Sequence, residues 1–204
     1  MFRVLLWCTF FLGFSAFGQV QWNKTLKDLD LRGITIDMRF IQGLTLSTHR
    51  SKDVLLNTQS EGEYQLQYVV VTQHENHWLT VYPQRAPSFN SFNDKLSAHK
   101  VIAMHLEIRV PESIKVEIEA NQGKLNVSGL YRELYIQLDE GSLKMSHIAE
   151  QSTIKTKGAT VYLNIDSGTV ETKSEKGKVV GFIAPNQNYH YTIISQYGPI
   201  FLNQ

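Results

Sequence analysis

The residues best placed to do chemistry are two histidines in the segment His74-Glu75-Asn76-His77. Two imidazoles close together in a chain can bind zinc. The zinc-protease signature, however, has its histidines at i and i+4 on a helix, with a glutamate after the first. Here the spacing is i+3, in a polar segment typical of a turn, and no third ligand is evident. We therefore predict a solvated turn at this point, with no metal and no cofactor.

A second candidate chemistry is sugar cleavage by paired carboxylates. Asp139 and Glu140 lie at one predicted turn, and Asp166 and Glu175 lie at or near later turns. A glycosidase needs two carboxyl groups roughly 5 to 10 Å apart, and stacked turns could bring these side chains together. Lysines alternate with them, as solubility alone would produce at solvated corners. We predict no catalytic residue and no enzyme activity, with a carbohydrate-active β-helix enzyme as the alternative.

Other reactive arrangements and charge patterns are missing from the sequence. It contains no Gly-x-Ser-x-Gly nucleophile motif, no phosphate-binding loop and no dinucleotide fingerprint. The 20 basic and 19 acidic residues are interspersed without a polybasic run. Because nucleic-acid binding requires a concentrated positive surface, nucleic acid is not an expected partner.

The segment we predict as a binding surface is the irregular loop 83–100, which is rich in Pro, Ser and Asn. It carries Phe89, Phe92 and Lys95. Loops on a rigid scaffold often carry function, and exposed aromatic rings can stack on sugars or anchor a protein. We expect the partner to be a protein or a glycan at the cell surface. Asn93–Met104 has an N-cap and helix formers, which suggest one short helical turn.

The elements that must position such a surface are set by five glycines in the second half of the chain. They follow one another at intervals of 18, 17, 19 and 21 residues, and we predict them as structural turns: Gly123, Gly141, Gly158, Gly177 and Gly198. Turns at regular spacing with strand-like sequence between them are typical of a β-solenoid. A glycine at such a corner suits a positive φ, which other residues adopt only at a cost.

Apolar residues recur at matching places between these turns, and alternation at period two runs through most of the chain. If successive coils stack, the apolar residues form two inward ladders: Leu125/Val127, Leu143/Met145, Leu163/Ile165 and Val179 with Phe182 on one side, and Leu134/Ile136/Leu138, Ile154, Val170 and Ile193 on the other. We predict an all-β fold, a single-stranded β-solenoid (β-helix) with short coils of about 18 residues from about residue 111. The β-region before it is less regular. The alternative is an antiparallel sandwich whose glycines are unrelated hairpin turns.

The first 18 residues have the pattern of a cleaved signal peptide. Arg3 precedes the apolar run 4–17, and small residues stand at Ala16 and Gly18. We expect residues 19–204 to form one domain, with no further integral membrane segment. Export would place it in the periplasm, on the outer surface or in the medium of a Gram-negative bacterium.

The two ends of the predicted stack differ from its middle, because a terminal coil leaves strand edges without a pairing partner. The region around Trp22 is a candidate cap at one end. At the other end the chain stops at Phe201–Gln204, soon after the last glycine turn. We therefore predict an exposed edge there and edge-to-edge self-association.

The stretch 110–180 resembles the putative-adhesin β-solenoid family of exported bacterial domains, similar to the heads of autotransporter adhesins. The resemblance rests on repeated "small or polar-Gly-x-aliphatic" turns: Gln122-Gly123-Lys124-Leu125, Glu140-Gly141-Ser142-Leu143 and Ser167-Gly168-Thr169-Val170. It implies a non-catalytic adhesin or cell-envelope interaction module, and it supplies no catalytic residues to carry over. The other alternative is a periplasmic accessory protein of an envelope signalling system.

Overall fold

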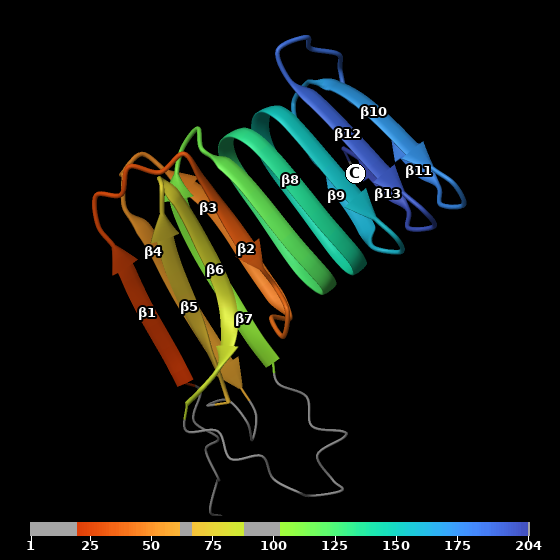
Figure 1. Cartoon of the computed structure of the whole chain (residues 1–204). Coiled ribbons are helices and arrows are strands. Elements are labelled where there is room, and N and C mark those ends of the chain that lie inside the picture. Colours follow the sequence, from red (N-terminus) through yellow and green to blue (C-terminus); the bar gives the residue numbers. More distant parts are fainter. Residues whose placement is uncertain (1–19, 62–66, 88–102, 204) are drawn as a thin grey trace, which may run out of the picture.

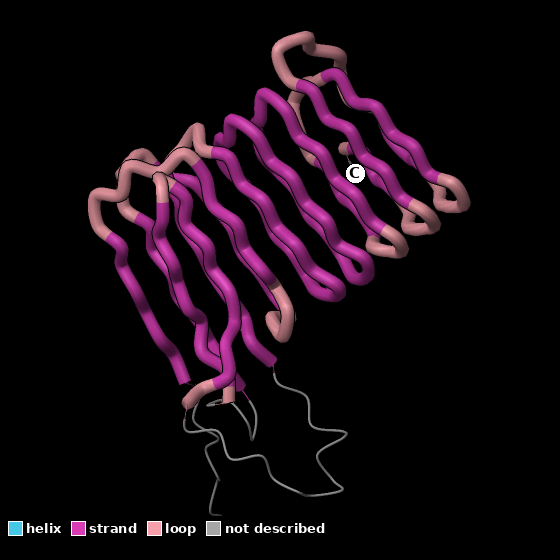
Figure 2. The backbone as a smooth tube through the Cα atoms, viewed as in Figure 1, coloured by secondary structure: helices cyan, strands magenta, loops and turns pink. Residues whose placement is uncertain are grey.

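The computed structural model describes residues 20–61, 67–87 and 103–203, which form strands and no helix (Figure 2). The all-β prediction is therefore confirmed for these residues. Nothing among them has the helical length and apolar character that a membrane crossing needs. The predicted signal peptide, most of the loop 83–100, and the predicted helical turn up to residue 102 lie outside the described residues.

Thirteen strands join in a single mixed sheet. In chain order they are β1 (Val20–Leu26), β2 (Gly33–Asp37), β3 (Gly43–His49), β4 (Val54–Glu61), β5 (Tyr68–Glu75), β6 (Trp78–Arg85), β7 (Ala103–Pro111), β8 (Lys115–Thr156), β9 (Thr160–Leu163), β10 (Thr169–Ser174), β11 (Val179–Gly181), β12 (His190–Ser195) and β13 (Ile200–Leu202). Met104, the end of the predicted helical turn, instead lies in strand β7. Pro83, placed in the predicted loop, lies in β6, because that strand continues to Arg85.

The strands stack as coils, each coil having one strand on either face of the molecule. Strand β8 winds continuously through several corners (Figure 1). On one face β6, β2, β8, β12 and β10 pair in that order, and on the other β7, β3, β8, β9, β13 and β11 do so. All of these pairings are parallel, which confirms the predicted parallel rungs of the second half.

The coils do not stack in chain order, which corrects the sequence prediction. The last coil, β12 and β13, lies between β8–β9 and the earlier coil of β10 and β11. The coil of β2 and β3 likewise lies between β6–β7 and β8. The predicted edge at Phe201 is therefore wrong, because Phe201 pairs with Tyr162 on one side and Val180 on the other. Among the described strands, the open edge at this end belongs to β10 and β11.

The other end of the stack is built from antiparallel strands. Strand β1 pairs with β4, which pairs with β7, and β5 pairs with β6. The β5–β6 connection is a two-residue turn in which Asn76 and His77 both have positive φ, of 51° and 65°. Such a turn matches the twist of a hairpin, so the turn predicted at His74–His77 is confirmed, and its two central residues are Asn76 and His77.

Alternate residues of each strand point into a core between the two faces. Ile154 pairs with Ile193, and Leu143 with Val161, and all four side chains are fully buried. The predicted inward ladders are therefore correct through most of their length. They fail in the terminal coil, where Val179 is 43% exposed because no further described strand pairs with β11. Phe182 is 74% exposed because the register places Gly181, not Phe182, level with the inward Leu202.

At four of the five predicted corners glycine is required for close approach more than for positive φ. Of these five, only Gly141 has a positive φ, of 115°. A Cβ on Gly141 would collide with the carbonyl oxygen of Gly123, and one on Gly177 with that of Gly198. A Cβ on Gly198 would collide with the carbonyl oxygen of Ala159, whereas one on Gly158 would meet the side chains of Tyr197 and Glu140. At Gly141, Gly177 and Gly198 the corners stack backbone on backbone, which leaves no room for a side chain.

Candidate functional site

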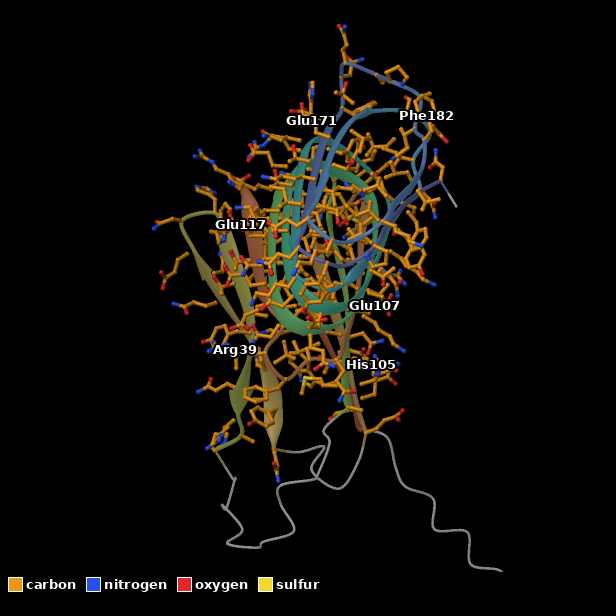
Figure 3. All side chains as sticks on the ribbon, turned by 90° about the vertical axis from the view of Figure 1, so that its right-hand side faces the viewer. Arg39, His105, Glu107, Glu117, Glu171 and Phe182 are labelled. Atoms are coloured by element: carbon orange, nitrogen blue, oxygen red, sulfur yellow. The ribbon has the colours of Figure 1, made fainter. Side chains whose placement is uncertain are left out.

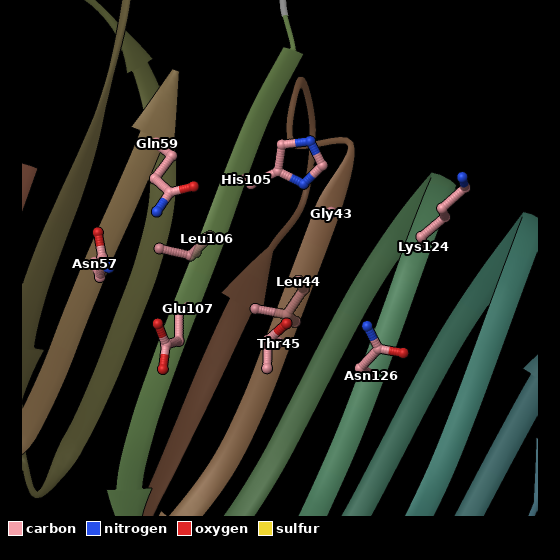
Figure 4. A pocket seen from close by; sticks show the side chains of 10 residues that line it. All are labelled: Gly43, Leu44, Thr45, Asn57, Gln59, His105, Leu106, Glu107, Lys124 and Asn126. Atoms are coloured by element: carbon pink, nitrogen blue, oxygen red, sulfur yellow. The ribbon is translucent and has the colours of Figure 1, made fainter. Parts of the chain in front are cut away.

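A polar groove lies on the outer face of β4, β7, β3 and β8. Its volume is about 330 Å³, and ten residues line it (Figure 4). Strand register sets the outward side chains in two parallel rows across the four strands. One row is Gln59, His105, Gly43 and Lys124, and the other is Asn57, Glu107, Thr45 and Asn126.

Period-two alternation explains why these residues face outward. Leu44, Leu106 and Leu125 occupy the intervening positions and are buried in the core. Their burial fixes the register, because a slip of one residue would turn every apolar side chain to water. The groove therefore lies on a rigid support. His105 and Glu107 project from one side of the molecule, while Arg39 and Glu117 project from the opposite side (Figure 3).

Gly43 makes the floor of the groove. A glycine inside a strand weakens the strand, and it commonly marks a close approach by another group. The imidazole of His105 occupies the space that a Cβ on Gly43 would need, with Cε1 only 2.9 Å from that position. The missing side chain thus lets His105 lie across the strand between Gln59 and Lys124.

The carboxylate of the groove has an ion-pair partner, whereas the ammonium group has none among the described residues. Glu107 accepts a hydrogen bond from Arg109, with Nη2 and Oε1 3.0 Å apart. Lys124 is exposed and has no ion-pair partner within the described part of the chain. A second hollow of about 240 Å³ shares Asn57 and Glu107 with the groove and extends the polar surface to Asn23 on β1. Amide, carboxylate, imidazole and ammonium groups together suit hydrogen bonding to a polar ligand.

The predicted histidine turn is polar, as expected. His77 Nδ1 lies 2.9 Å from the backbone oxygen of Asp30 and 3.2 Å from its carboxylate. His74 lies within β5. Among residues 20–61, 67–87 and 103–203, no group of three His, Cys, Asp or Glu side chains could hold a metal ion.

Two of the four predicted corner carboxylates contact residues of other corners. Asp139 pairs with Lys157, with Oδ2 and Nζ 2.7 Å apart. Glu140 accepts a hydrogen bond from the hydroxyl of Tyr197, and this bond raises the pKa of Tyr197. Asp166 and Glu175 are exposed and take no part in these pairs. The prediction of solvated corners therefore fits Asp166 and Glu175, whereas Asp139 and Glu140 contact other corners.

One buried polar cluster combines residue types that elsewhere serve in nucleophilic catalysis. His147 Nε2 lies 3.2 Å from the hydroxyl oxygen of Ser152, and both side chains are buried. The rings of Tyr131 and Tyr191 enclose the imidazole. At 1–2% exposure neither His147 nor Ser152 can reach a substrate, so the pair is structural.

The predicted binding residues Phe89, Phe92 and Lys95 lie outside the described residues. Sequence reasoning missed the groove, because its four strands come from distant parts of the chain and only the folded register aligns them. A usable signal was present in the outward Gly43 and in the Asn and Gln residues at alternating positions of β4.

Comparison with known proteins shows similarity in structure but not in sequence family. No protein-family model matches the chain, and no curated protein is similar to it in sequence. A solved structure described as a putative cell adhesion protein from Clostridium sporogenes has a TM-score of 0.57 at 13% identity, covering 91% of this chain and 99% of that chain. At this identity the match shows a shared fold and no shared chemistry.

Two further solved structures match less well. A putative adhesin from Bacteroides fragilis has a TM-score of 0.37 at 12% identity, covering 91% of this chain and 97% of that chain. A putative lipid binding protein from Parabacteroides distasonis has a TM-score of 0.33 at 10% identity, with coverage of 89% and 96%. These two scores are too low to support an argument about this chain.

Proposed function

We propose that this chain is an exported β-solenoid that works by surface contact, as an adhesin-like module without catalytic activity. The observation that carries the proposal is the groove, in which two rows of polar side chains cross four strands in register. A rigid outer face with aligned hydrogen-bonding groups is suited to holding an extended ligand.

The solenoid interpretation is supported by the parallel pairing of successive coils and by the stacked glycine corners. The adhesin-like role is supported by the fold shared with the Clostridium protein described as a putative cell adhesion protein. The predicted signal peptide supports export to the envelope or the cell surface, as one domain from residue 19 onward.

A glycan is the ligand class that the groove fits best. Asn57, Gln59 and Asn126 each offer a donor and an acceptor on one planar group, and Glu107 accepts while Lys124 donates. Neighbouring sugar hydroxyls require that alternation of donors and acceptors. A protein partner would be expected to use apolar anchors, and Leu44 and Leu106 in the groove are buried.

The test is binding of the chain without residues 1–18 to an immobilised panel of bacterial and host glycans. The variant Asn57→Ala/Asn126→Ala removes two amides from one row without touching the core. We expect binding to weaken about 5- to 150-fold, since two lost hydrogen bonds at roughly 0.5–1.5 kcal/mol each remove about 1–3 kcal/mol.

The matched control is Thr153→Ala/Lys155→Ala, which removes two outward side chains on the opposite face. Strand pairing places Thr153 beside Thr192 and Lys155 beside Ile194, away from the groove. The control should bind like the unaltered chain. Equal losses in both variants, or no glycan binding at any concentration tested, would contradict the proposal. Capture of a protein instead would move the ligand class to protein.

A further inference from the structure

The end of the stack formed by β10 and β11 is open. Within the described residues, β10 pairs with β12 alone and β11 with β13 alone. At equivalent inward positions, Ile154 and Ile193 are fully buried, whereas Thr172 of β10 is exposed. Phe182 adds a largely exposed ring beside this end (Figure 3).

The direction of the backbone groups in β10 follows from the hydrogen bonds at its two ends. Thr169 N donates to Tyr189 O at 2.8 Å, and Glu175 N donates to Ser195 O at 3.2 Å. Odd-numbered residues therefore face β12, because direction alternates along a strand. The N–H and C=O groups of Val170, Thr172 and Ser174 point to the free edge.

The side chains of β10 are complementary to a second β10 that runs in the opposite direction. If Thr172 faces Thr172 of the other copy, Glu171 faces Lys173 and Lys173 faces Glu171. Both residues are exposed and lie on the outer side of the strand, level with Thr192 and Ile194. Two opposite-charge pairs would form, and Thr172, whose backbone groups point outward, would lie at the centre of the ladder.

We infer that a second copy of this chain covers the open end, by antiparallel pairing of the two β10 strands about a two-fold axis through Thr172. This contact uses the same surface in both copies, so it closes at two and does not propagate into a fibre. Addition in the same direction would instead place like charges opposite each other, which destabilises a strand pair. The inference is independent of the proposed glycan site.

The opposite end of the stack is a poorer place for such a contact. Its outer strands are β1 and β5. A side-chain hydrogen bond, from Lys24 Nζ to Thr72 Oγ1 at 2.7 Å, already joins these strands across the end of the molecule. No comparable bond is recorded between β10 and β11 in the described residues.

The experiment is sedimentation-velocity ultracentrifugation of the chain without residues 1–18, over a hundredfold range of concentration. The unaltered chain should show a monomer–dimer equilibrium. Glu171→Lys and Lys173→Glu each create two like-charge pairs and should weaken dimerisation at least about tenfold. The combined variant Glu171→Lys/Lys173→Glu restores opposite charges and should recover dimerisation.

Thermal unfolding of each variant checks that the monomer is intact, since both positions are exposed. Lys155→Glu, outward on β8 and away from the edge, is the matched charge-reversal control and should dimerise normally. A monomer throughout the range would overturn the inference. So would a dimer indifferent to the single charge reversals, a double variant that stays monomeric, or growth into filaments.

Discussion

At the scale of single residues, the least ordinary environment belongs to His147. The rings of Tyr131 and Tyr191 have centroids 6.1 and 5.4 Å from the imidazole, both near edge-on. Nε2 contacts Ser152, whereas Nδ1 has no hydrogen-bond partner in the described structure. Burial lowers the pKa of His147 to about 4, because the charged form would lose its hydration. The folded chain therefore holds a neutral imidazole.

This burial predicts acid sensitivity. The unfolded chain binds a proton at His147 below about pH 6.5, while the folded chain binds it only below about 4. Stability should fall as the pH decreases through that window, by about 2.5 kcal/mol at pH 4.5. The double variant His147→Phe/Ser152→Ala keeps the aromatic packing and leaves no unpaired hydroxyl. The free energy of unfolding, measured in urea at pH 7 and at pH 4.5, should fall less in this variant than in the unaltered chain. The difference between the two decreases should be about 2.5 kcal/mol.

The control for this measurement is His190→Phe, at an exposed position on β12. Its stability should follow the same pH dependence as the unaltered chain. An unchanged pH profile in the His147 variant would show that another group causes the acid sensitivity.

At the scale of elements, the glycine corners provide a matched pair of substitutions. Gly141 combines a φ of 115° with direct contact to the backbone of Gly123, so Gly141→Ala forces strain and a collision together. We expect a loss of roughly 3 kcal/mol or more. A Cβ on Gly123 would lie 3.1 Å from Gln42 O and 3.4 Å from Met38 Cε. Gly123→Ala should therefore cost only about 1 kcal/mol.

Urea unfolding of the two alanine variants gives the comparison directly. Equal losses would mean that the corners relax freely and that close backbone stacking is not what requires glycine there.

Local patterns predicted the elements well, since alternation and glycine spacing are properties of short segments. They could not predict the order of the coils. Val179 and Ile200 hold equivalent inward positions on neighbouring strands, so either coil offers an acceptable inward face to β9. The choice depends on whole coils, because β12 places the large apolar side chains of Tyr191 and Ile193 next to β8, whereas β10 has Val170 and Thr172 at the equivalent positions. The groove was missed for a related reason, because its rows exist only after distant strands align.

At the scale of the whole molecule, protection from hydrogen exchange should follow position in the stack and not position in the chain. Strand β12 is bonded on both sides, whereas β10 is bonded on one side in the described structure. Amides of β12 that bond its neighbours should exchange at least about tenfold more slowly than those of β10, which opens with the terminal coil. Exchange followed by mass spectrometry at a dilution that keeps the chain monomeric measures both peptides together. Equal or reversed rates would contradict the observed order of coils.

Because β12 and β13 lie between β8–β9 and β10–β11, they also determine the order in which the strands can pair as the chain is synthesised. A polypeptide emerges from the ribosome with β10 and β11 ahead of the strands on which they rest. β10 and β11 cannot form their native strand pairs until residues 190–202 have been synthesised and have paired with β8 and β9. Completion of the native state is thereby tied to strands that are translated after β10 and β11, and premature closure of that end is avoided.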